Sequence, residues 1–171
     1  MSTDALFSST DGKGSEDWAT PLWLFDELDR EFGFDLDCCA SSHNAKVDRF
    51  IGKEGDALAC SWREFGSVVW CNPPYGRQVS KWVRQAYQES RDGLIVVMLL
   101  PARTDTIWFH DYGLLAEEIR FIRGRLHFER ADGHTGPATF PSMILVFDKG
   151  RARPQMAGYE QNNKNKRRSP K

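Results

Sequence analysis

Residues 67–76 read SVVWCNPPYG, and this stretch sets the fold class that the sequence predicts. Residues 68–71 form an apolar run of strand character, which ends abruptly at Asn72, Pro73, Pro74 and Tyr75. Proline has no N–H group to donate to a sheet, so the strand has to end there. We therefore expect the side chain of Asn72 at the rim of a sheet rather than inside it.

Predicted helices and strands alternate on both sides of this stretch. Residues 19–33 have the pattern of a helix that Thr20 can cap, with Pro21 at its first position and Gly33 just after its end. Further helices are expected at 78–90 and 105–115. Strands are expected at 34–40, 46–51, 67–71, 93–101 and 117–122. Residues 125–130 and 142–148 are predicted to be the two arms of a hairpin joined by the Gly- and Pro-rich loop 131–141.

This alternation predicts an α/β fold with a parallel sheet covered by helices on both faces. Such sheets bind ligands beyond the carboxyl ends of their strands. The stretches 34–40 (FDLDCCA) and 67–76 both place polar residues at such an end. The sequence therefore predicts a functional site where these two strands end.

The composition is that of a soluble protein with one folded domain. The chain has 171 residues, 40% of them hydrophobic and 27% charged. No window reaches the roughly 20 apolar residues of a membrane span, and the polar N-terminus resembles neither a signal peptide nor a transit peptide. The four cysteines have neither metal-site nor disulfide-framework spacing, so we expect no metal and a reducing cytoplasm: Cys38, Cys39, Cys60 and Cys71.

Charge divides the chain into a folded part and a basic end. We expect a flexible segment at 1–16, a folded domain at 17–150 and a disordered tail at 151–171. The tail carries seven Lys or Arg residues and one Glu. Such an arm can bind nucleic-acid phosphates by releasing counterions, or it can serve only as a solubilising tail.

The tetrapeptide at 72–75 suits the methylation of an aromatic amine. The nitrogen lone pair of adenine N6 is delocalised into the ring and is a poor nucleophile. The side-chain oxygen of Asn72 and the main-chain oxygen of Pro73 can accept the two amine protons and localise that lone pair, while the prolines fix both acceptors. The ring of Tyr75 can stack on a base extracted from its duplex. The alternative is that these four residues form only a rigid turn.

Together with its neighbouring motifs, the tetrapeptide resembles the phage and prophage DNA N-6-adenine methyltransferases of the Dam type. The resemblance runs from Trp18 to Phe147 and rests on W-x-T-P at 18–21, GDAL at 55–58, NPPY at 72–75, LLPARTDTIWFH at 99–110, GRLHF at 124–128 and FPSMILVF at 140–147. It implies a Rossmann-like sheet that is mostly parallel with a C-terminal antiparallel hairpin. It also implies transfer of a methyl group from S-adenosylmethionine to a flipped-out adenine in double-stranded DNA.

The resemblance also implies roles for particular residues. Six match cofactor-binding positions: Trp18, Thr20 and Pro21, which would close over the methionine part, Asp37 and Ala40 of the first loop, and Asp56, which would accept a hydrogen bond from the cofactor's adenine. Asn72, Pro73, Pro74 and Tyr75 would be catalytic. Three residues would touch DNA: Phe128 as the clamp of the flipped base, Phe140 as the alternative clamp, and Arg103 at a phosphate. The first loop, DLDCCASSHNAK, lacks the glycines usual in methyltransferases.

Other functions and plain structural roles stay open at this point. The same tetrapeptide also serves enzymes that methylate RNA or a protein glutamine, and a non-catalytic DNA-binding module is an alternative of another class. Asp37 can be a solvated acid at a strand end, and Asp56 can be a turn former or a helix cap. We expect a cytoplasmic protein of a bacterium or a phage-infected cell, with a monomer as the working assumption. The recognised DNA sequence is left open.

Overall fold

The structure is a computed structural model that describes residues 18–52, 55–130, 135–151 and 155–159. For Trp18, Arg130 and residues 155–159 it describes the main chain only. The expected flexible segment 1–16 and the last twelve residues of the expected tail, 160–171, lie outside the described residues.

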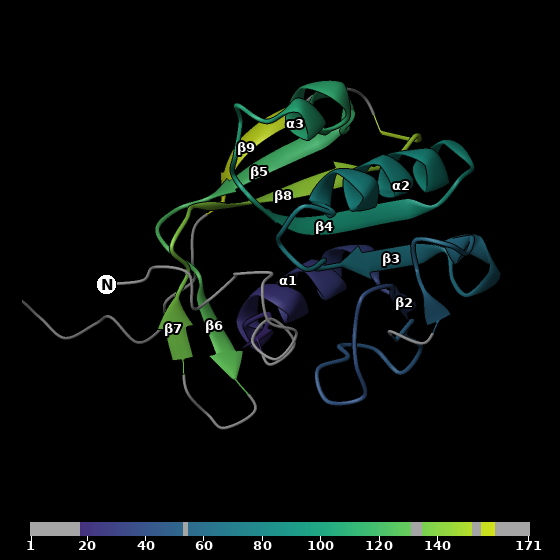
Figure 1. Cartoon of the computed structure of the whole chain (residues 1–171), viewed down its shortest axis with the longest axis horizontal. Coiled ribbons are helices and arrows are strands. Elements are labelled where there is room, and N and C mark those ends of the chain that lie inside the picture. The colour runs from purple at the N-terminus through teal and green to yellow at the C-terminus, as the bar shows by residue number, and fades with distance from the viewer. Residues whose placement is uncertain (1–17, 53–54, 131–134, 152–154, 160–171) are drawn as a thin grey trace, which may run out of the picture.

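A mixed six-stranded sheet forms the centre of the protein (Figure 1). Its strands lie in the order β2 (Leu36–Asp37), β3 (Val68–Cys71), β4 (Ile95–Pro101), β8 (Ser142–Phe147), β5 (Glu118–Ile122) and β9 (Gln155–Tyr159). The pairs β2–β3, β3–β4 and β5–β9 are parallel, whereas β8 is antiparallel to both of its neighbours. The expected α/β fold is confirmed, and the sheet is mixed because β8 runs opposite to the strands on either side of it.

Helices cover both faces of this sheet, as the alternation predicts. Helix α1 (Leu22–Phe32) packs on one face, where Phe25 contacts the ring of Trp70 in β3. Helix α2 (Val79–Arg91) packs on the other, where Tyr87 contacts Phe147 in β8. Trp70 pairs with Val97, and Val97 pairs with the residue before Phe147, so the two rings point to opposite faces. The short helix α3 (Ile107–Asp111) packs beside α2 and leads into a 3-10 turn, η3 (Gly113–Leu115). A second 3-10 turn, η2 (Trp62–Glu64), precedes β3.

The expected hairpin between 125–130 and 142–148 is wrong. Strand β6 (His127–Arg130) pairs instead with β7 (Thr135–Pro137) and with β1 (Trp18–Ala19) in a separate three-stranded sheet. Strand β8 inserts between β4 and β5 of the main sheet. Its six residues are all buried, since β4 and β5 flank it and α2 packs against it. Spacing along the sequence does not reveal that the returning chain passes β6 and enters the main sheet.

Part of the segment that composition assigns to a disordered tail is ordered. Residues 155–159 form β9 and extend the sheet beside β5. Just before it, Arg151 forms ion pairs with Glu31, Glu118 and Asp148, and its guanidinium lies over the ring of Phe32. Main-chain hydrogen bonds and a cluster of opposite charges therefore hold a segment that has little apolar content of its own.

Strands β2 and β3 end at the same edge of the sheet, which fixes the position of the site. Asp37, the last residue of β2, pairs with Trp70 in β3, so Cys38 and Asn72 follow closely placed strand ends. The expected strand at 46–51 is not a strand, and only one parallel bridge joins Asp37 to Phe50. That bridge nevertheless brings Ile51 to the same edge, where its N–H donates to the main-chain oxygen of Asp37.

Candidate active site

Both ends of the Asn72 side-chain amide are held by hydrogen bonds. Its Nδ2 atom donates to Oγ1 of Thr20 over 3.1 Å, and the Tyr75 hydroxyl donates to its Oδ1 over 2.8 Å. Asn72 follows β3 directly, at the rim of the sheet, as the double proline predicts. The strand end, the start of α1 and the NPPY turn thus converge on one amide group.

Tyr75 is a buried, neutral residue beside this amide. Its hydroxyl lies 3.2 Å from the main-chain oxygen of Leu99 in β4 as well as close to Asn72. Burial, with smaller contributions from Cys71 and Cys39, raises the pKa of Tyr75 well above its ordinary value. The hydroxyl can therefore donate hydrogen bonds at any physiological pH, but it is not suited to act as a base.

Two further side chains, those of Phe140 and Arg103, lie one after the other between Tyr75 and solvent. The ring of Phe140 meets that of Tyr75 edge-on, with 5.5 Å between centroids, and the guanidinium of Arg103 lies 5.7 Å from the Phe140 centroid. Phe140 is half-buried and Arg103 is exposed. Phe128, the other expected base clamp, is 1% exposed in β6 and has no surface open to a base. Of the two expected clamps, only Phe140 therefore has surface open to a ligand.

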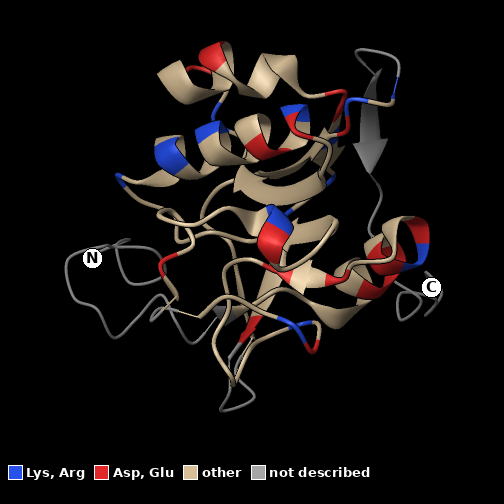
Figure 2. Ribbon diagram, turned by 90° about the vertical axis from the view of Figure 1, so that its right-hand side faces the viewer, with Lys and Arg blue, Asp and Glu red and all other residues tan. Residues whose placement is uncertain are grey.

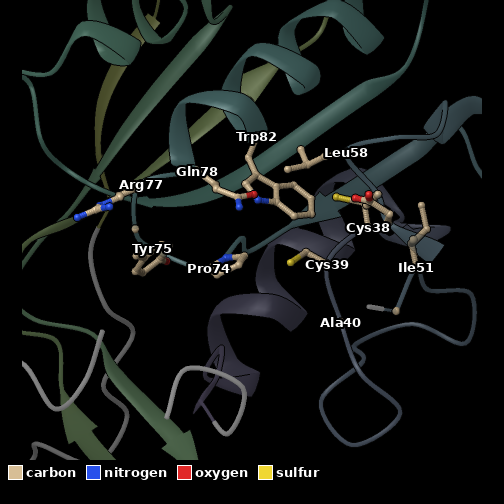
Figure 3. A pocket seen from close by; sticks show the side chains of 14 residues that line it. Cys38, Cys39, Ala40, Ile51, Leu58, Pro74, Tyr75, Arg77, Gln78 and Trp82 are labelled. Atoms are coloured by element: carbon tan, nitrogen blue, oxygen red, sulfur yellow. The ribbon is translucent and has the colours of Figure 1, made fainter. Parts of the chain in front are cut away.

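A pocket of about 470 Å³ opens beside Tyr75 (Figure 3). Tyr75 lies at one end of it and Ile51 at the other, with Trp82 of α2 facing Cys39 and Ala40 across it. Its walls are mostly apolar, with a few polar groups, which is the usual make-up of a small-molecule site. The lining residues are Cys38, Cys39, Ala40, Ile51, Gly52, Asp56, Ala57, Leu58, Pro74, Tyr75, Gly76, Arg77, Gln78 and Trp82.

Asp56 lines this pocket in a strained main-chain conformation. Its φ angle of 36° makes it the one non-glycine residue with positive φ in the described part of the chain. Such conformations cost roughly 1–3 kcal/mol and are concentrated at functional sites. Its main-chain oxygen accepts a hydrogen bond from the N–H of Ala59, which closes a tight turn, whereas its carboxylate is exposed. Asp56 can therefore offer its carboxylate to a ligand in the pocket.

Asp37 shapes the pocket without lining it. Its carboxylate is 3% exposed and accepts hydrogen bonds from the main-chain N–H groups of Cys39 and Lys46, each over 3.2 Å. These bonds tie together the two ends of the segment 39–46, which carries Cys39 and Ala40 to the pocket. Burial raises the pKa of Asp37 to about 6, although both hydrogen bonds favour its ionised form.

The start of α1 differs from the expected cap. The residue at the helix N-cap is Pro21, and no side chain caps the helix, so the expectation that Thr20 caps it is wrong. Gly33 ends the helix in the left-handed conformation, as expected. Neither Thr20 nor Pro21 lines the pocket, and the side chain of Trp18 lies outside the described residues.

Sequence reasoning missed several residues that line the pocket: Cys38, Cys39, Ile51, Leu58, Arg77, Gln78 and Trp82. The signals for some of them are simple, since Arg77 and Gln78 follow the tetrapeptide directly and Trp82 is on the apolar side of α2. Ile51 carries no such signal, because only the tertiary bridge between Asp37 and Phe50 brings it to the site.

Charge is distributed unevenly over the helices, as Figure 2 shows. Helix α1 contains four acidic residues and one basic residue. The exposed face of α2 instead carries Lys81 and Arg84, and the exposed Arg77 lies just before it at the pocket. Among the described residues, no cluster of His, Cys, Asp or Glu could hold a metal ion, and no helix has both the length and the apolarity to cross a membrane.

Comparison with known proteins gives one consistent result. Residues 8–169 match the family model described as DNA N-6-adenine-methyltransferase (Dam). The chain is 35% identical over 148 residues to the DNA N-6-adenine-methyltransferase of Haemophilus phage HP1 (strain HP1c1), which covers 82% of this chain and 83% of that protein. It is 34% identical over 118 residues to the DNA N-6-adenine-methyltransferase of Escherichia phage T1, covering 68% of this chain and 48% of that protein. This chain therefore belongs to the DNA N-6-adenine-methyltransferase (Dam) family.

Proposed function

We propose that the pocket binds S-adenosylmethionine and that the NPPY turn presents the N6 amine of a flipped-out adenine to it. DNA adenine-N6 methylation is the activity of the family, so an RNA or protein-glutamine acceptor and a non-catalytic DNA-binding module are no longer favoured. The observation that carries the proposal is that Asn72 hydrogen-bonds to Tyr75, which also lines the pocket.

The chemistry of the pocket residues fits this cofactor. The carboxylate of Asp56 can accept a hydrogen bond from the cofactor's adenine amine, and the apolar side chains of Ile51, Leu58 and Trp82 can contact the adenine ring. Ala40 is small enough to let the methionine part approach the main chain. Strands β2, β3 and β4 are parallel, and the pocket is lined by residues that follow the carboxyl ends of β2 and β3. This arrangement supports a Rossmann-like assignment of the sheet. When bound, S-adenosylmethionine supplies an electrophilic methyl group on a sulfonium.

The acceptor chemistry belongs to Asn72 and Pro73. Their side-chain and main-chain oxygens accept the two protons of the adenine amine, which localises the nitrogen lone pair and directs it at the methyl carbon. These fixed dipoles would also stabilise the positive charge that N6 gains, until one of its two protons passes to water. Pro74 holds the turn, and the ring of Tyr75 stacks on the base. In this assignment Asp37 supports the cofactor loop, and Trp18 closes over the cofactor.

Duplex DNA is the proposed form of the substrate. A stacked adenine cannot reach Asn72, so the base has to leave the helix, which requires a few kcal/mol of unstacking. We assign the second stacking face to Phe140 rather than Phe128, because Phe140 is half-buried beside Tyr75. Arg77, Lys81 and Arg103 are exposed and follow the carboxyl ends of the neighbouring strands β3 and β4, which supports phosphate contacts at that end of the sheet. The enzyme would act on DNA in the cytoplasm of a bacterial or phage-infected cell.

A direct test uses DNA from a host that lacks adenine methylation. We expect the purified protein to bind labelled S-adenosylmethionine in equilibrium dialysis and to produce N6-methyladenine in duplex DNA, detected by mass spectrometry of the nucleosides. Asn72→Ala should abolish turnover and leave cofactor binding nearly unchanged, because the lost interaction forms in the transition state. Gln88→Ala, an exposed amide on α2, is the matched control. Wild-type turnover by Asn72→Ala would refute the proposed role of Asn72.

A further inference from the structure

Thr20 is a buried residue whose hydroxyl is free of the helix that follows it. It lies between β1 and α1 and is 2% exposed. In the first turn of α1 the N–H groups of Leu24 and Phe25 donate to the main-chain oxygen of Pro21, and no side chain caps the helix. The Thr20 hydroxyl instead accepts the hydrogen bond of Asn72 Nδ2, across 52 positions of the chain.

A hydrogen bond at one end of an asparagine amide fixes the other end. The amide is planar, and the torsion that rotates it has only broad minima, so an unrestrained side chain samples many orientations. With Nδ2 held by Thr20, the Oδ1 atom of Asn72 faces the hydroxyl of Tyr75, and Tyr75 lines the pocket. The direction of the acceptor oxygen therefore depends on a residue outside the NPPY turn.

Thr20 is itself well anchored. The residue before it, Ala19, pairs with Glu129 in β6, and the helix after it buries Leu24 and Phe25 in the core. Thr20 is thus fixed by the scaffold and can in turn fix the amide of Asn72. Support of this kind keeps a catalytic group within the narrow range of positions and orientations that catalysis requires.

We propose that Thr20 is a positioning residue for methyl transfer, which holds Asn72 Nδ2 so that Oδ1 faces the adenine amine. This inference rests on the role proposed above for Asn72. It differs from a role in cofactor closure, because a cofactor contact would act on cofactor affinity, whereas positioning of Asn72 acts on the rate of the bound complex.

The test compares Thr20→Val, which keeps the branched shape and loses the hydroxyl, with Thr20→Ser, which keeps the hydroxyl. We expect Thr20→Val to lower kcat at least tenfold, with the Kd for S-adenosylmethionine, measured by calorimetry, unchanged within about twofold. Thr20→Ser should recover most of the wild-type kcat. Ser90→Ala is the control for loss of a buried hydroxyl, since Ser90 bonds to the main chain near the far end of α2. If Thr20→Val does not fold by circular dichroism, Thr20→Ala replaces it under the same criteria.

Two results would overturn the inference. One is a wild-type kcat in the folded hydroxyl-free variant. The other is a rise in the Kd for S-adenosylmethionine that matches the loss of activity, which would make Thr20 a cofactor ligand. Both leave the proposed function intact. If instead the wild-type protein binds S-adenosylmethionine and methylates no DNA, the proposed function itself is wrong.

Discussion

The hydroxyl of Tyr75 lies within hydrogen-bond distance of two oxygens, Asn72 Oδ1 at 2.8 Å and the main-chain oxygen of Leu99 at 3.2 Å. It has one proton to share between them. When a substrate amine donates to Asn72 Oδ1, the Tyr75 proton can turn toward Leu99 and stay hydrogen-bonded. The free enzyme thus keeps this half-buried acceptor hydrogen-bonded, and substrate binding need not break a hydrogen bond without replacing it.

Tyr75 has two proposed functions: its hydroxyl donates a hydrogen bond to Asn72, and its ring stacks on the base. Tyr75→Phe keeps the ring and loses the bond to Asn72, so we expect kcat to fall about five- to tenfold. Tyr75→Ala also loses base stacking, which contributes about 1–3 kcal/mol per base, so its kcat/KM for DNA should fall on the order of 100-fold. Steady-state kinetics on one duplex measures both. Equal losses in the two variants would show that the ring does not stack on the base.

Substitution of Phe140 is expected to lower activity, whereas substitution of Phe128 is expected to lower stability. Phe140→Ala should lower kcat/KM for DNA tenfold or more with little effect on thermal stability, because Phe140 is half-buried beside Tyr75. Phe128→Ala should destabilise the fold by about 3–5 kcal/mol, because its ring is fully buried in the core. Thermal melts and kinetics of both variants test the assignment. A Phe140→Ala enzyme with wild-type kinetics would remove Phe140 from the role of base clamp.

Local patterns were sufficient to predict the position of Asn72. A strand that ends at a double proline has to place the next polar residue at the rim of the sheet, and the amphipathic helices on either side determine which layers cover it. The order of strands after β5 was not predictable in this way. Strand β8 is apolar throughout and suits any buried position, so only the packing of the whole sheet places it between β4 and β5.

The hydrogen bond between Thr20 and Asn72 shows a similar limit. Threonine before proline at the start of a helix has the local pattern of a cap, and that pattern is what the sequence predicts. The hydroxyl binds a residue 52 positions away because the fold brings the start of α1 against the end of β3. The local pattern predicts that the hydroxyl of Thr20 forms a hydrogen bond, but the tertiary contact determines that the bond is to Asn72.

Asp37 should give the stability of the protein a distinct pH dependence. Its pKa is about 6 in the folded protein against 3.8 for an ordinary Asp, so between these values the folded state holds a proton that the unfolded state has released. The free energy of unfolding should therefore fall as the pH rises from about 4 to 6, by at most about 3 kcal/mol from this group. Asp37→Asn should lack this contribution. Urea unfolding of both proteins at several pH values tests it, and parallel profiles would contradict the prediction.

Arg77 and Lys81 should contribute to DNA binding through phosphate contacts. Both are exposed, and neither forms an ion pair with any other residue in the described part of the chain. Each phosphate contact contributes roughly 0.9 to the slope of log K against log salt concentration, so the Arg77→Ala/Lys81→Ala double variant should lower the slope by about 2. The Arg30→Ala/Arg63→Ala double variant also removes two exposed charges, one bonded to a main-chain oxygen of α1 and one paired with Asp92, and serves as the control for net charge. Fluorescence anisotropy on a duplex between 50 and 300 mM salt measures the slopes. An equal decrease in the control would attribute the effect to overall charge, whereas a decrease in the double variant alone would place the DNA backbone along the start of α2.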